Sequence, residues 1–283
     1  MERAVILIEC PDQKGIVARV SDFIFRLDAN IIQSDQYSTD PENGVFFMRL
    51  EFCFDPKRLS RNILEKEFAS LAKKLRAHWN LHYHSTRLRI GILLSKEAHC
   101  LVDILYRQAS GEFHADITCV ISNHPDHRIV VEQAGVPYHY IPVSAKTKSK
   151  SEKDILALVQ KNTDVLVLAR YMQILSPKFL KAYKHDIINI HHSFLPSFKG
   201  ANPYKQAHER GVKVIGATAH YVTENLDEGP IIEQVVERMT HRDDLDDLRR
   251  KSRHLEKVAL ANAIQAHVEH RVIRYKNKTI VFA

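Results

Sequence analysis

Asn189 and His191 carry an amide and an imidazole that could act together on a carbonyl group. They lie two positions apart at the end of the run from Ile187 to His191, which has the pattern of a β-strand. Side chains two residues apart in a strand leave the same face of the sheet. An amide can donate a hydrogen bond to a carbonyl oxygen while an imidazole moves protons, so the pair favours attack on a carbonyl carbon. On spacing alone, the alternative that both residues merely finish a strand stays equally open.

Asp227 is the carboxylate that could complete this pair. It lies in the segment Thr223 to Pro230, between two expected strands. An Asp before Gly-Pro is usually turn chemistry and nothing more. The residue gains a catalytic meaning only if this loop folds back over His191, where the carboxylate would orient the imidazole.

A third segment follows another expected central strand, Val165 to Ala169. Three of its side chains, Met172, Ile174 and Leu175, could form an apolar slot for a flat ring. Core packing at a strand-to-helix turn is an equally good interpretation of the same pattern. The candidate binding residues are Tyr171, Met172, Gln173, Ile174 and Leu175.

Glycine is absent where a phosphate loop would need it. The turn after the expected strand Leu88 to Leu94 reads Ser95 to Cys100 without a glycine, and the whole chain has only nine. A phosphate-binding turn needs glycine for close backbone approach. The pattern therefore argues against a nucleotide or a sugar phosphate as ligand. The 17 histidines include no HExxH motif, so we expect no metal site.

The elements that must position these residues read as a doubly wound sheet from residue 85 onward. Short apolar runs at 88–94, 117–121, 138–141, 165–169 and 187–190 are separated mostly by helical patterns, which favours a mostly parallel, Rossmann-like α/β sheet. Ligands of such sheets bind beyond the carboxyl ends of the strands. The Lys- and Ser-rich stretch 144–153 has no periodicity and is expected to be a surface loop.

The first 84 residues have a different order, β-α-β-β-α-β, which predicts a ferredoxin-like domain. Its third strand alternates cleanly, with Phe46, Met48, Leu50, Phe52 and Phe54 on one face. Two helices cover one face of such a sheet, and the other face is bare unless something packs on it, so we expect pairing with another copy of the chain. The predicted domains are residues 1–84 and 85–283.

Composition narrows the class of protein. No apolar run approaches the ~20 residues that cross a bilayer, and the N-terminus lacks a signal-peptide layout, so a cytoplasmic protein is expected. The formal charge of +7 comes from basic residues mixed with acids along the chain. No basic stripe interleaved with aromatic residues indicates a nucleic-acid partner. A small polyanionic ligand would suit this charge.

These motifs together resemble the folate-dependent formyltransferases. The resemblance rests on Asn189 to His191, on Ser193 to Gly200 and on Leu226 to Gly229. It implies that Asn189, His191 and Asp227 form a catalytic trio and that Tyr171 to Leu175 lines a pterin pocket. The turn Cys10 to Gly15 resembles that of an ACT-type regulatory domain.

An ACT-type domain ahead of a formyltransferase-like domain resembles the formyltetrahydrofolate deformylases. The resemblance implies hydrolysis of 10-formyltetrahydrofolate to formate and tetrahydrofolate, which would supply formate for purine synthesis and balance the one-carbon folate pool. It implies no cofactor beyond the folate substrate and a possible amino-acid effector at the ACT domain. The exposed sheet face expected in the first domain favours a homo-oligomer. Two alternatives stay open: transfer of the formyl group to an amine, and a sensor that binds ligand without turnover.

Overall fold

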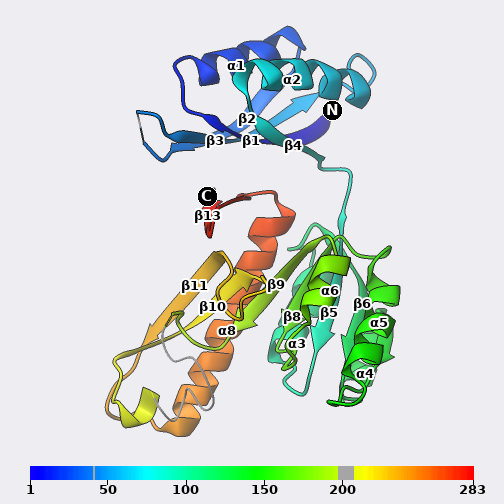
Figure 1. The fold of residues 1–283 in the computed structure, drawn as a ribbon, viewed down its shortest axis with the longest axis vertical. Helices are drawn as coiled ribbons and strands as arrows, with labels where there is room; N and C mark the ends of the chain where they lie inside the picture. The colour runs from blue at the N-terminus through cyan, green and yellow to red at the C-terminus, as the bar shows by residue number, and fades with distance from the viewer. Residues whose placement is uncertain (41, 197–206) are drawn as a thin grey trace. The chain divides into compact units, whose positions relative to one another are not determined.

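The computed structural model describes residues 1–40, 42–196 and 207–283 (Figure 1). They form two compact units. The first contains residues 1–87 with 270–275 and 280–283, and the second contains residues 88–269 with 276–279. The domain bounds 1–84 and 85–283 stay a prediction. In the structure, part of the C-terminal segment packs with the first unit.

The first unit has the predicted ferredoxin-like order. Its four strands form an antiparallel sheet in the order β2-β3-β1-β4. The elements are β1 (Glu2–Pro11), α1 (Ile16–Arg26), β2 (Asn30–Ser38), β3 (Val45–Phe54), α2 (Arg61–Leu75) and β4 (His78–Tyr83). The alternation predicted for β3 is confirmed, because Phe46, Met48, Leu50, Phe52 and Phe54 all lie in the core with the buried residues of both helices.

The opposite face of this sheet is covered in part by a segment from the far end of the chain. A C-terminal hairpin, β12 (Val272–Tyr275) and β13 (Lys278–Val281), supplies Ile273 and the following Phe282 to a second apolar cluster with Val5, Leu7 and Phe47. The ring of Phe47 meets that of Tyr275 edge-on at 5.1 Å. Sequence patterns missed this contact because it joins the two ends of the chain. Pairing with another copy stays a prediction.

The second unit is built on a seven-stranded sheet in the order β11-β10-β9-β8-β5-β6-β7. Strands β5 to β9 are parallel, while β10 and β11 are antiparallel, so the predicted mostly parallel sheet is confirmed. The strands are β5 (Leu88–Leu94), β6 (Ala115–Ser122), β7 (Tyr138–Tyr140), β8 (Val165–Ala169), β9 (Asp186–His191), β10 (Val214–Tyr221) and β11 (Ile231–Arg238).

Helices flank this sheet, and the longest, α8, packs on β9, β10 and β11 and beside α3 (Figure 1). The helices are α3 (His99–Ala109), α4 (Arg128–Gln133), α5 (Lys148–Val159), α6 (Pro177–Ala182) and α8 (Leu245–Val268). Among the described residues, no helix has both the length and the apolar character that a membrane span requires.

Helix α5 corrects the loop expected at 144–153. The helix begins at Lys148, and its first buried residues are the polar Ser151 and Glu152. Ser151 donates a hydrogen bond to the carbonyl of Pro142 at 2.9 Å, and the carboxylate of Glu152 accepts one from the backbone N–H of Ser176 at 2.9 Å. A search for apolar periodicity cannot detect a helix face that begins with buried polar groups.

Candidate active site

The site lies where β8 and β9 end. These strands are parallel neighbours, so their carboxyl ends open at the same edge of the sheet. Strand β10 runs antiparallel beside β9 and pairs His220 with Asn189. Because Asn189 and His191 alternate with buried Ile190, both side chains leave the same face, as expected.

The loop between β10 and β11 brings Asp227 back to β9. At Gly229 the backbone passes so close that a Cβ atom would lie 1.7 Å from the carbonyl oxygen of Tyr221, so only glycine fits this return. Asp227 itself has a left-handed backbone with φ of 55°. Its Oδ2 lies 3.3 Å from Nδ1 of His191. The structure therefore brings the three predicted catalytic side chains together.

The contact with Asp227 leaves the other ring nitrogen of His191 for chemistry. With a proton on Nδ1 facing the carboxylate, Nε2 carries a lone pair. Nε2 is buried and has no hydrogen-bond partner among the described residues. The contact with Nδ1 of His191 holds the pKa of Asp227 well below its usual range, so the carboxylate stays ionised.

His220 is a member of the site that sequence reasoning missed. Its Nδ1 donates to the carbonyl of Tyr221 at 2.9 Å, and Nε2 accepts from the amide of Asn189 at 3.2 Å. Nε2 also lies 3.7 Å from Oδ1 of Asp227. Alternation along β10 puts His220 on one sheet face, but only the register between β9 and β10 shows what it touches.

A cavity of about 320 Å³ adjoins these groups. Its wall includes Asn189, His191, Asp227 and His220 together with the whole predicted binding segment Tyr171 to Leu175. Along that segment, Tyr171 and Leu175 are buried, whereas Met172 and Ile174 are each 60% exposed. A flat ring lying on the two exposed side chains would cover apolar surface, and burial of that surface would stabilise the bound ligand.

Ser95 fixes the position of this binding segment. Its hydroxyl accepts the backbone N–H of Met172 at 3.1 Å and donates to the side-chain oxygen of Asn123 at 2.7 Å. Ser95 is the first residue of the glycine-free turn between Ser95 and Cys100. At the position of a phosphate loop, this chain therefore has a residue that supports the wall of the pocket.

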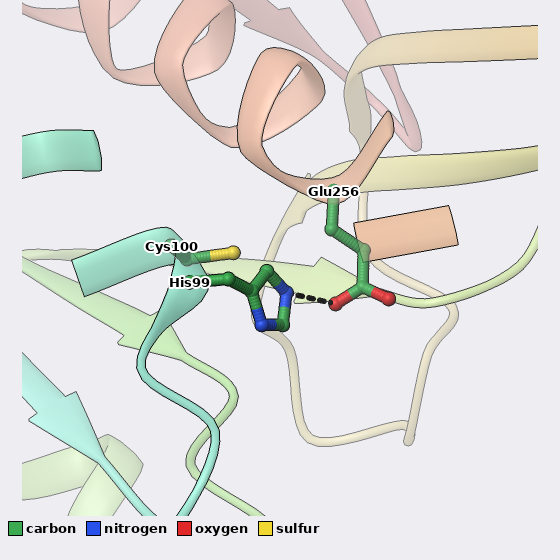
Figure 2. A group of neighbouring side chains, drawn as sticks. All are labelled: His99, Cys100 and Glu256. Atoms are coloured by element: carbon green, nitrogen blue, oxygen red, sulfur yellow. Dashed lines mark hydrogen bonds and ion pairs between the residues drawn. The ribbon is translucent and has the colours of Figure 1, made fainter. Parts of the chain in front are cut away.

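The same turn contributes to a cluster of His99, Cys100 and Glu256 (Figure 2). Their ligand atoms lie within 4.8 Å of one another, a spacing that a metal ion could bridge. Two observations fit a metal poorly. The guanidinium of Arg170 already lies 3.4 Å from Oε2 of Glu256. Burial, followed by the neighbouring Glu256 carboxylate, raises the pKa of the Cys100 thiol well above its ordinary value, and a protonated thiol is a poor ligand.

Comparisons with known proteins agree with this architecture. Residues 88–264 match the Formyl transferase family, and residues 4–67 match the ACT domain family. The chain is 50% identical over 281 residues to a formyltetrahydrofolate deformylase of Synechocystis sp., covering 99% of this chain and 98% of that protein. It is also 50% identical over 282 residues to the formyltetrahydrofolate deformylase of Bacillus subtilis, covering 99% and 94%.

Solved structures give the same result in three dimensions. The crystal structure of a formyltetrahydrofolate deformylase from Pseudomonas syringae pv. tomato superposes with a TM-score of 0.93 at 45% identity, covering 100% of this chain and 95% of that one. The β10–β11 loop and the binding segment are thus parts of a fold that is shared along the whole chain.

Proposed function

Because the chain belongs to the formyltetrahydrofolate deformylase family, we propose that it hydrolyses 10-formyltetrahydrofolate through Asn189, His191 and Asp227. The products are formate and tetrahydrofolate. The observation that carries the assignment of residues is the 3.3 Å contact between His191 and Asp227 beside a cavity whose wall is Tyr171 to Leu175.

His191 moves the protons in this scheme. Nε2 takes a proton from water as the water oxygen bonds to the formyl carbon. The same nitrogen then gives that proton to N10 of the folate as the bond between the formyl carbon and N10 breaks. Formic acid leaves and loses its proton to solvent. Asp227 keeps the ring in the orientation that presents Nε2, and its negative charge stabilises the protonated imidazole between the two steps.

Asn189 supplies the hydrogen bond to the formyl oxygen as it becomes an oxyanion. A donor in this position is worth roughly 3 kcal/mol in comparable sites. One N–H of its amide bonds to His220, which fixes the side chain and leaves the second N–H for substrate. His220 is therefore assigned a positioning role.

Water is the nucleophile in this proposal because the turn Ser95 to Cys100 lacks the glycine that would admit a sugar phosphate beside the formyl group. The test is to mix the protein with 10-formyltetrahydrofolate in buffer alone and to measure formate and tetrahydrofolate. Release of both products supports the hydrolase. Turnover that requires an added amine would identify a transferase, and binding without any product would identify a sensor.

We also propose the finer features that the resemblance implies. The chemistry of an amide, an imidazole and a carboxylate needs no resident cofactor beyond the folate substrate. The ACT domain is proposed to bind an amino-acid effector and the chain to form a homo-oligomer in the cytoplasm. The match of residues 4–67 to the ACT domain family supports the regulatory assignment.

A further inference from the structure

Arg170 is a charged residue of the cavity wall that the mechanism above does not use. It directly follows β8 and directly precedes the binding segment. Its backbone is left-handed, with φ of 64°, a conformation that costs free energy for a side chain other than glycine. Strained residues of this kind cluster at functional sites, which indicates a role for the Arg170 guanidinium.

Buried Glu256 anchors that guanidinium. Oε2 of Glu256 accepts a hydrogen bond from Nε2 of His99 at 2.8 Å (Figure 2). The same oxygen lies 3.4 Å from Nε of Arg170. The other carboxylate oxygen of Glu256, Oε1, accepts from the hydroxyl of Ser252 at 3.3 Å. Glu256 is 0% exposed, and a buried carboxylate is tolerated only with such partners. The network therefore holds one edge of Arg170 in a defined place.

The guanidinium of Arg170 keeps N–H groups for a ligand. The side chain is 12% exposed and lines the cavity, and within the described part of the chain its buried Nε is ion-paired with Glu256 but forms no hydrogen bond. A guanidinium presents parallel N–H groups that match the two oxygens of a carboxylate. Arg170 lines the same cavity as His191, so a carboxylate bound in that cavity is within reach of a wall that carries this cation.

A carboxylate in this system has two sources, formate and the glutamate tail of the folate. The position of Arg170 favours formate. Arg170 and His192 both line the cavity beside His191. The ring of His192 lies 5.1 Å, centroid to centroid, from that of His191. Arg170 thus lies toward the reacting end, whereas a long glutamate tail needs an open exit.

We propose that Arg170 binds the carboxylate of the departing formate, and that Glu256 and His99 are positioning residues that aim its guanidinium. This inference rests on the proposed function. Formate release leaves an anion beside Asp227, and a cation on the pocket wall offsets the repulsion between these two negative charges. The same contact would stabilise the late tetrahedral intermediate, in which the second oxygen of formate is already bonded.

The first experiment compares Arg170→Gly and Arg170→Lys. Glycine suits the left-handed backbone, so lost activity in that variant reports the guanidinium and not the strain. We expect the formate inhibition constant of Arg170→Gly to rise and its kcat to fall, each roughly tenfold to hundredfold, the value of a charge-assisted hydrogen bond. KM for 10-formyltetrahydrofolate should change less than about threefold, since the pterin wall is intact. Arg170→Lys keeps the positive charge, so its formate inhibition constant and kcat should lie between those of the wild type and of Arg170→Gly.

Controls separate the sources of the effect. Chloride at matched ionic strength replaces formate to remove screening effects. Arg107→Gln removes an ion-paired arginine of α3 from outside the cavity and should leave both constants unchanged. A substrate without the glutamate tail distinguishes the two carboxylates. If Arg170→Gly weakens binding only of the complete folate, Arg170 binds the tail and the inference is wrong.

The positioning role needs milder variants, because removing one partner of a buried ion pair can unfold the protein. His99→Gln keeps a hydrogen-bond donor near Glu256, whereas His99→Ala removes it. We expect formate inhibition to weaken in His99→Ala and to recover in His99→Gln, with equal far-UV circular dichroism in both. Equal formate inhibition in all folded variants, or none in the wild type, overturns the inference. A wild type without hydrolysis would instead refute the proposed function.

Discussion

The pH dependence of stability offers a quantitative test of the site, through His192. Burial and the Arg170 cation lower its pKa from 6.5 in an exposed chain to about 4 in the folded protein. The unfolded chain therefore binds a proton at a higher pH than the folded chain does. The stabilisation is complete above pH 6.5 and is lost as the pH falls toward 4.

The magnitude follows from linkage. Between pH 7.5 and 4.5, a shift from 6.5 to about 4 corresponds to a loss of about 2.5 kcal/mol in the free energy of unfolding. That is a large share of the ~5–15 kcal/mol that stabilises a typical domain. Replacing His192 by Gln removes the titrating group. The free energy of unfolding of the variant should therefore fall less between pH 7.5 and 4.5 than that of the wild type, by about this amount.

Urea unfolding at each pH provides the assay. Far-UV circular dichroism senses both units, while the only tryptophan, Trp79, lies in the first, so its fluorescence identifies the transition of that unit. His241→Gln, at an exposed histidine, controls for the loss of a ring. Parallel pH curves for the wild type and His192→Gln would refute the placement of His192 in a partly buried site beside the Arg170 cation.

The remaining predictions concern the catalytic geometry. Asn189→Ala should lower kcat by roughly a hundredfold to a thousandfold, as loss of an oxyanion donor does, with little change in folate affinity; an unchanged kcat in a steady-state assay would exclude the residue from catalysis. Asp227→Asn keeps a residue type that tolerates the left-handed backbone. It removes the negative charge that faces His191, so single-turnover rates should fall roughly tenfold or more. Gly229→Ala forces a Cβ against the carbonyl of Tyr221, so deformylation should be largely lost while tetrahydrofolate analogues, measured by calorimetry, still bind the segment before α6.

The part of the site that could be predicted from the sequence is the part that depends on local spacing. Asn189 and His191 share a face because strand periodicity is two, and the parallel sheet follows from its apolar runs. Asp227 could be joined to them only through the resemblance. Its position depends on the close approach of Gly229 to Tyr221, a contact that a single sequence does not display.

His220 and Glu256 escaped prediction for a different physical reason. His220 faces the site because β10 is antiparallel to β9 in one particular register, and a shift by one residue would turn its side chain to the other face. Glu256 looks like one charged residue among many on a long helix. Its burial depends on its contact with His99, which lies more than a hundred residues earlier in the chain, and a single sequence does not show such a contact.

The trio and its supports differ in how they constrain the reaction. Asn189 and His191 lie on the central strand β9, whose backbone is hydrogen-bonded to β8 on one side and to β10 on the other. Asp227 lies on a loop and is held by its contact with His191 and by the return of the chain at Gly229. Since the orientation of His191 depends on a residue of the β10–β11 loop, changes in this loop should alter kcat even when every reacting group is kept. That distinguishes this site from one in which all three groups project from the sheet.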